Sequence, residues 1–277
     1  MVNKPPKSLI EHLTAGRCVL FAGSGLSAWA KLPTWRDFLK FMVEKLYEEE
    51  PGKHDKKELD DLLEKGKLLD IADYCKEAFS SALYTNILSS KLRGDDVIDF
   101  PDPYKLIVQL PFTAVITTNY DKLLERAYER LANISPKTPT HMDIDSLGTL
   151  LFMNNFFILK AHGDIDRPES LILTTSDYSG IIHSNPAFNS LFSAILLTKA
   201  ILFIGYSISD PDFRLLLERQ LTTFKGYVPD RYALMSGVGE IEQQVLLRSA
   251  GIKVLPYAEH DDVKTFLEAL RDDIVRK

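Results

Sequence analysis

The chain has 277 residues, which is enough for one large domain with a sizeable hydrophobic core. Apolar residues make up 45% and charged residues 26%, a composition typical of globular proteins that excludes fibrous and disordered chains. The net charge of -6 at pH 7 gives no general attraction to nucleic acid. Two cysteines, Cys18 and Cys75, are too few for a disulfide framework or a four-thiolate zinc site, which favours a reducing compartment.

The sequence also carries no membrane or secretion signal. Its first residues lead into no signal-peptide core. The longest apolar stretches, 147–159 and 191–206, are interrupted by Asn154-Asn155 and by Thr198-Lys199 before they reach the roughly 18 residues that a membrane span requires. We therefore expect a cytoplasmic protein without membrane contact.

Short apolar runs alternate with amphipathic stretches along most of the chain. This pattern is typical of a parallel sheet that is buried on both faces, and it predicts an α/β fold with a doubly wound, Rossmann-like parallel sheet. The predicted strands cover residues 18–22, 114–117, 156–159, 200–204, 232–235 and 253–255. The predicted helices cover residues 121–131, 187–198, 212–221, 241–249 and 261–274.

Residues 36–95 depart from this alternation, because the segment is charged, has helical periodicity and contains no convincing strand. We interpret it as a helical insertion after the first strand, within a single domain that spans residues 1–277. Two ordinary surface helices with a long loop would explain the pattern as well. No internal repeat or Pro-rich linker divides the chain, so a second independent domain is not expected.

The first predicted strand ends in a glycine-rich turn, Ala22-Gly23-Ser24-Gly25-Leu26-Ser27. Glycines at the end of a parallel strand let the backbone approach a pyrophosphate, and the following amides supply an anion site. The turn matches the G-x-G-x-x-G pattern only in part, since Ala28 occupies the third glycine position. Glycine-rich turns also arise for steric reasons alone, so the motif is compatible with nucleotide binding or with simple packing.

Polar motifs follow three further strands: Thr117 to Asp121, His162 to Asp164, and Gly205 to Asp210. Because ligands bind outside the carboxyl ends of the strands in open α/β sheets, we expect all four motifs to line one crevice. Each motif has a structural alternative when it is taken alone. Asn119 and Asp121 could cap the next helix, His162 could be a turn histidine, and Gly205 could belong to a simple turn. The convergence of the four favours a functional site.

These motifs resemble, in the same order, those of the sirtuin-like NAD-binding proteins. The sirtuin Gly-Ala-Gly-x-Ser element and the loop that follows it correspond to residues 23–27 and 31–36 here, with the same spacing. The remaining elements correspond to Thr117-Thr118-Asn119-Tyr120-Asp121, His162-Gly163 and Gly205-Tyr206-Ser207. The resemblance covers roughly residues 18–257.

The chain also departs from the deacylating sirtuins. Those enzymes hold a structural zinc ion with two Cys-x-x-Cys pairs, whereas no cysteine follows Cys75 here, so we expect no metal. Lys31 and Thr34 replace the Gly and Asp of the sirtuin loop. Residues 173–178, 205–210 and 251–257 instead resemble a bacterial branch that lacks the zinc module and acts in anti-phage defence.

The resemblance to this branch implies a function. It implies an NAD hydrolase that cleaves NAD to nicotinamide and ADP-ribose and so depletes NAD in infected cells, with NAD as a substrate and not as a recycled cofactor. An NAD-dependent protein deacylase and a non-catalytic sensor of NAD or ADP-ribose are the alternatives. The implied partners are further copies of the chain in a homo-oligomer and a separate sensor, such as a HerA-type ATPase or an Argonaute-like protein, without direct contact to nucleic acid.

NAD cleavage passes through an oxocarbenium-like ribosyl centre, and the expected roles follow from that chemistry. Asn119 would position the nicotinamide ribose and a water molecule, Asp121 would accept a hydrogen bond from the carboxamide, and His162 would act as general base, since histidine titrates near neutral pH. The residues expected to bind the dinucleotide are Gly23, Ser24, Gly25 and Ser27 at the pyrophosphate, Arg36 near the phosphates or the nicotinamide ribose, Gly205 and Ser207 at the adenosine ribose, and Thr117 in the loop after the second strand.

Overall fold

The computed structural model describes residues 4–178, 185–208 and 211–276. It contains one six-stranded sheet of parallel strands in the order β3-β2-β1-β4-β5-β6. This topology confirms the predicted doubly wound, Rossmann-like architecture. The order reverses between β1 and β4, and ligands of such sheets bind at this switch point. The strands are β1 (Cys18–Ala22), β2 (Ala114–Thr117), β3 (Ile158–Lys160), β4 (Ala200–Ile204), β5 (Arg231–Ser236) and β6 (Ile252–Tyr257).

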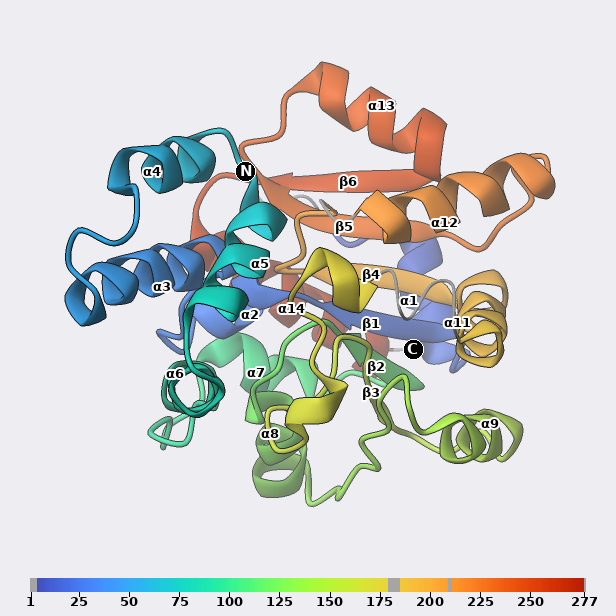
Figure 1. Cartoon of the computed structure of the whole chain (residues 1–277). Helices are drawn as coiled ribbons and strands as arrows, with labels where there is room; N and C mark the ends of the chain where they lie inside the picture. The colour runs from blue at the N-terminus through green and yellow to red at the C-terminus, as the bar shows by residue number, and fades with distance from the viewer. Residues whose placement is uncertain (1–3, 179–184, 209–210, 277) are drawn as a thin grey trace.

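Helices cover both faces of the sheet (Figure 1). Successive strand residues point to opposite faces, so Leu20 belongs to one hydrophobic core and Phe21 to the other. The first core includes α1 (Lys7–Thr14), α7 (Asp102–Ile107), α8 (Leu123–Ala132) and α14 (His260–Val275). The second includes α9 (Ile144–Phe152), α11 (Pro186–Thr198), α12 (Pro211–Thr223) and α13 (Glu240–Ala250). In the described part of the chain no helix combines the length and the apolar character that a membrane span requires.

Between β1 and β2 the chain is helical. After the short α2 (Ser24–Ala28) come α3 (Trp35–Glu49), α4 (Lys56–Glu64), α5 (Leu68–Ala78) and α6 (Ser81–Leu92), which gather beyond the end of the sheet where α2 follows β1 (Figure 1). These four helices form a third hydrophobic core, which also takes up Ile165 and Leu173 and packs against Tyr120. The insertion at residues 36–95 remains a proposal, which this core supports. The helices thus pack against the segments that follow β2 and β3.

The edge of the sheet at β3 differs in detail from the expectation. The strand was expected over residues 156–159, whereas it covers Ile158–Lys160 and ends on a fully buried lysine. A charged side chain is tolerated there because the Lys160 ammonium lies 3.1 Å from a carboxylate oxygen of Glu125. Residues 137–140 run parallel to the outer side of β3 through isolated bridges, so the strand is covered at this edge.

Candidate functional site

The turns after β1 and β4 pack against each other backbone to backbone. The amide of Gly23 donates to the Ile204 carbonyl oxygen at 3.1 Å, and the amide of Gly25 donates to that of Gly205 at 2.8 Å. A Cβ atom on Gly23 would lie 2.5 Å from the Gly205 oxygen, and one on Gly205 would lie 2.2 Å from the Leu26 nitrogen. These glycines are therefore required for the close approach of the two turns at the switch point.

We expect Gly205→Ala to lower the free energy of unfolding by about 2–4 kcal/mol, because φ at Gly205 is +64° and the new methyl group would also overlap the Leu26 amide. Gly237→Ala is the matched control, since Gly237 has φ +68° and its new methyl group would meet no neighbouring atom within 4 Å. It should lose only about 1 kcal/mol. Urea unfolding of both variants measures the difference, and equal losses would contradict the packing argument.

The loop after β2 places Asn119 against the glycine turn. The Asn119 side-chain amide donates to the Gly23 carbonyl oxygen at 2.9 Å and to Ser27 Oγ at 2.7 Å. Because the Gly23 carbonyl can only accept, the amide nitrogen must face it, and both amide hydrogens are used. No described residue donates to Asn119 Oδ1, so this atom is left for a ligand.

Asp121 is linked to Asn119 through the Ser27 hydroxyl. Its carboxylate accepts from the Ser27 hydroxyl at 2.6 Å and from the Leu123 amide at 3.0 Å. Burial raises the pKa of Asp121, with opposing contributions that include the Lys160 charge. Asp121 and Ser27 are both buried, and their contacts hold the Asn119 side chain in place.

Lys160, which was not predicted from the sequence, joins the loops that follow β2 and β3. Its ammonium donates to the carbonyl oxygens of Tyr120, at 3.1 Å, and of Asp121. It also lies 4.0 Å from the Asp164 carboxylate, which Lys122 approaches to 2.8 Å. Burial raises the pKa of Asp164, but the two ammonium groups and the neighbouring hydrogen bonds leave it below its usual value.

His162 follows β3 in this joined pair of loops. It is half-buried, and its carbonyl oxygen accepts from the Ile172 amide at 2.9 Å, which fixes the main chain. The Tyr178 hydroxyl lies 3.4 Å from His162 Nδ1, and the two rings meet edge to face with centroids 5.2 Å apart. The loop and Tyr178 together limit the orientations that the imidazole can adopt.

A second histidine, His141, lies close to His162 and was not predicted from the sequence. Its side chain is 7% exposed, and its buried Nδ1 atom has no hydrogen-bond partner in the part of the chain that the structure describes. Burial and the neighbouring His162 lower the pKa of His141 to about 4. The ring is therefore neutral at physiological pH.

This shift predicts a loss of stability in acid. Between pH 6.5 and pH 4 the unfolded chain protonates His141 while the folded protein does not, so the stabilisation present above pH 6.5 is lost as the pH falls. At about 1.4 kcal/mol per pKa unit, the loss from this group is about 3 kcal/mol. His141→Phe should reduce the acid-dependent fall in the free energy of unfolding, measured in urea at several pH values. An unchanged pH dependence in the variant would contradict the burial of a neutral imidazole.

The remaining predicted residues occupy varied positions. Thr117 is buried, where its hydroxyl donates to the backbone of β1 and accepts from the Asn119 amide, so it shapes the loop. Ser24 is half-buried at the start of α2, whereas Arg36 in the first turn of α3 and Ser207 after β4 are exposed. Ser209 and Asp210, which end the motif after β4, lie outside the described residues.

Residues 113–255, more than half of the chain, match the SIR2-like domain family. The chain belongs to this family. It is 25% identical over 213 residues to the NAD(+) hydrolase ThsA of Cytobacillus dafuensis, which covers 77% of this chain and 40% of that protein. It is 26% identical over 232 residues to the NAD(+) hydrolase ThsA of Bacillus cereus (strain MSX-D12), covering 83% and 45%.

This SIR2-like chain is also 24% identical over 257 residues to Defense-associated sirtuin 2 of Bacillus subtilis, covering 91% of this chain and 24% of that protein. The chain thus spans less than half the length of these curated relatives. Within the described residues, no three His, Cys, Asp or Glu side chains are grouped so that they could hold a metal ion.

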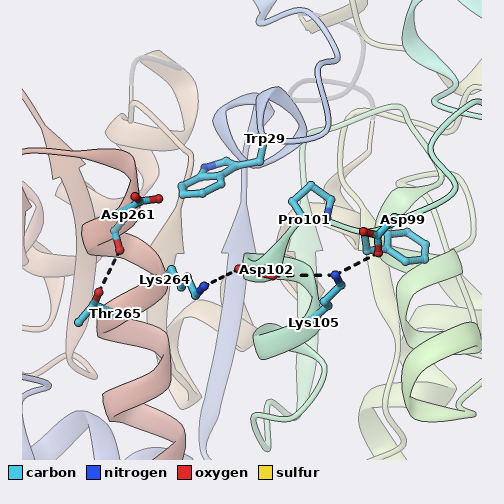
Figure 2. Close-up of a pocket in the computed structure, with 9 residues that line it drawn as sticks. Trp29, Asp99, Pro101, Asp102, Lys105, Asp261, Lys264 and Thr265 are labelled. Atoms are coloured by element: carbon cyan, nitrogen blue, oxygen red, sulfur yellow. Dashed lines mark hydrogen bonds and ion pairs between the residues drawn. The ribbon is translucent and has the colours of Figure 1, made fainter.

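A cavity of about 610 Å³ lies between the end of α2, the start of α7 and the first turns of α14 (Figure 2). None of the predicted site residues lines it. Its two lysines are paired with carboxylates, Lys264 with Asp102 at 2.6 Å and Lys105 with Asp99 at 3.0 Å. These pairs leave no cation free for a pyrophosphate, so the cavity is a poor candidate for the NAD phosphates.

Proposed function

We propose that this chain hydrolyses NAD to nicotinamide and ADP-ribose. The observation that carries the proposal is the continuous contact between the four strand-end loops: Gly23 and Gly25 touch Gly205, Asn119 binds Gly23, and Lys160 ties the Asn119 loop to the His162 loop. The similarity to two proteins named NAD(+) hydrolase supports the same reaction for this chain.

In this proposal the acceptor atom of Asn119 holds the nicotinamide ribose and the attacking water. Its amide hydrogens are already used, so Oδ1 accepts from a ribose hydroxyl or from the water. Ser27 and Asp121 keep the side-chain carboxamide of Asn119 in this orientation. His162 takes the proton of the water as the ribosyl–nicotinamide bond breaks and the ribosyl centre gains positive charge. Nicotinamide leaves as a neutral molecule, and the hydroxyl group completes ADP-ribose.

The dinucleotide would lie across the switch point between β1 and β4. In this placement the turn at Gly23, Ser24 and Gly25 faces the pyrophosphate, and Gly205 and Ser207 face the adenosine ribose. The exposed guanidinium of Arg36 is available for the phosphates or the nicotinamide ribose.

We also infer the cellular setting from the relatives. One relative carries the name Defense-associated sirtuin 2, which supports a role as the NAD-depleting effector of a bacterial anti-phage system. Such an effector must be held inactive until infection. We therefore propose a cytoplasmic homo-oligomer that is controlled by a separate sensor, such as a HerA-type ATPase or an Argonaute-like protein.

Chromatography of NAD incubated with the purified protein tests the proposed reaction. We expect nicotinamide and ADP-ribose in equal amounts, without any acylated peptide, either from the protein alone or after addition of lysate from infected cells. Nicotinamide release that strictly requires an acylated peptide would identify a deacylase instead. Tight NAD binding without product under every condition would identify a sensor.

A further inference from the structure

The pairing of an irregular segment with β3 places His141 at the rim of the candidate site. Residues 137–140 run parallel to β3, with Lys137 opposite Phe157 and Thr140 opposite Lys160. Because parallel partners advance together, His141 comes level with Ala161, directly before His162. His141 therefore lies at the carboxyl end of the sheet, where ligands of this fold bind.

The main chain around His141 is held without help from its imidazole ring. Its carbonyl oxygen accepts from the Asn185 side-chain amide at 2.8 Å. On the other side, the amide and hydroxyl of Thr140 both donate to Asp143 at 2.8 Å, and Arg167 donates to the same carboxylate at 2.6 Å. The fold thus fixes this turn through backbone and neighbouring side-chain contacts.

The imidazole itself packs against aromatic side chains. Its ring meets Phe188 edge to face, with centroids 6.2 Å apart, and Phe188 stacks on Phe192 at 5.5 Å. The Nδ1 atom is buried, and it has no hydrogen-bond partner among the described residues. A buried polar atom without a partner destabilises a folded protein, and a phenylalanine would fill the same space without that penalty. Packing alone gives no reason for a histidine here.

We propose that His141 is a ligand-binding residue of the crevice, whose imidazole hydrogen-bonds the nicotinamide half of NAD. The inference rests on the proposed function. An imidazole packed against aromatic side chains, with a hydrogen-bonding atom that has no partner in the described residues, suits a flat heteroaromatic ring that carries a carboxamide. The ring stays neutral beside His162, because burial and that neighbour oppose its protonation. A neutral imidazole can donate or accept one hydrogen bond at Nδ1, according to its tautomer.

Steady-state kinetics of His141→Phe test the inference. We expect KM for NAD to rise about tenfold and kcat to stay within about threefold, the effect of one lost hydrogen bond to the substrate. The melting temperature at neutral pH should stay the same or rise. Tyr128→Phe is the matched control, since it removes another buried polar atom that has no partner, on α8, and should leave KM unchanged. A lower melting temperature with a parallel fall in kcat would indicate a structural role instead and overturn the inference.

Calorimetric titration separates this inference from the proposed reaction. His141→Phe should bind NAD about tenfold more weakly than the wild type and should bind ADP-ribose, which lacks nicotinamide, with unchanged affinity. If the variant binds NAD like the wild type, the inference is wrong even where the wild type hydrolyses NAD. If the wild type binds NAD without hydrolysing it, the proposed function fails, and weaker binding by the variant still supports His141. His141→Gln, which keeps a polar group, should retain most of the affinity and provides a second variant if His141→Phe does not fold.

Discussion

His162→Ala is expected to reduce the turnover of NAD by about 10² to 10⁴-fold while NAD affinity stays within a few-fold. The reason is that the imidazole is proposed to take a proton from water in the transition state, whereas the dinucleotide is held by other loops. The change should leave the fold intact, because the His162 main chain is fixed by the Ile172 amide and its side chain is only half-buried. A nicotinamide-release assay beside calorimetric titration measures both quantities on the same variant.

His12→Ala is the matched control for this substitution. His12 lies on α1, which leads into the amino end of β1, and its ring contacts Asp230 at 3.2 Å just before β5. It is therefore at the opposite end of the sheet from the candidate site. Turnover should be unchanged in this variant. Wild-type turnover in His162→Ala would exclude the general-base role.

Asn119→Ala should lower turnover by about 10²-fold, because the oxygen that positions the ribose and the water is removed. It should also lower the free energy of unfolding by about 1–3 kcal/mol, since the Gly23 carbonyl and the Ser27 hydroxyl each lose one of their buried hydrogen bonds. NAD affinity should fall only a few-fold. Turnover at the NAD concentration that saturates each variant, together with urea unfolding, separates the two effects.

Ser27→Ala tests the orientation of Asn119 with a smaller expected loss of turnover. This change leaves Asn119 in place but removes the hydroxyl that receives one of its amide hydrogens and that donates to Asp121. The Asn119 carboxamide would then be held by the Gly23 carbonyl alone, so turnover should fall about tenfold, less than for Asn119→Ala. A Ser27 variant with full activity would show that the Asp121 connection does not orient Asn119.

Much of the fold could be predicted because buried parallel strands are short apolar runs with clear ends. The strands at Cys18–Ala22, Ala114–Thr117 and Ala200–Ile204 have the predicted bounds. The bounds of β3 were harder to predict, since the apolar pattern gives no sign that Lys160 belongs to a strand. The charge of its ammonium is compensated by Glu125, which lies on α8. The helix α9 at Ile144–Phe152 was missed, although its buried residues Leu147 and Leu150 have the spacing of one helix face.

The candidate site was predictable where motifs follow strands, and less so where partners come from elsewhere. The Asn119 and His162 loops were expected together, and Lys160 connects them through backbone carbonyls. Ser27 is buried between Asn119 and Asp121, and its expected contact with a pyrophosphate stays a prediction. His141 had no sequence signal, since its place depends on an irregular segment that pairs with the edge of β3.

The structure of His162→Ala with NAD bound tests the central claim most directly. The substitution should slow hydrolysis enough to keep the dinucleotide intact. We predict that NAD lies across the switch point, with a nicotinamide ribose hydroxyl within hydrogen-bond distance of Asn119 Oδ1 and the pyrophosphate at the turn that contains Gly23 and Gly25. NAD bound instead in the cavity between Trp29, Asp102 and Lys264, with the strand-end loops empty, would contradict the account.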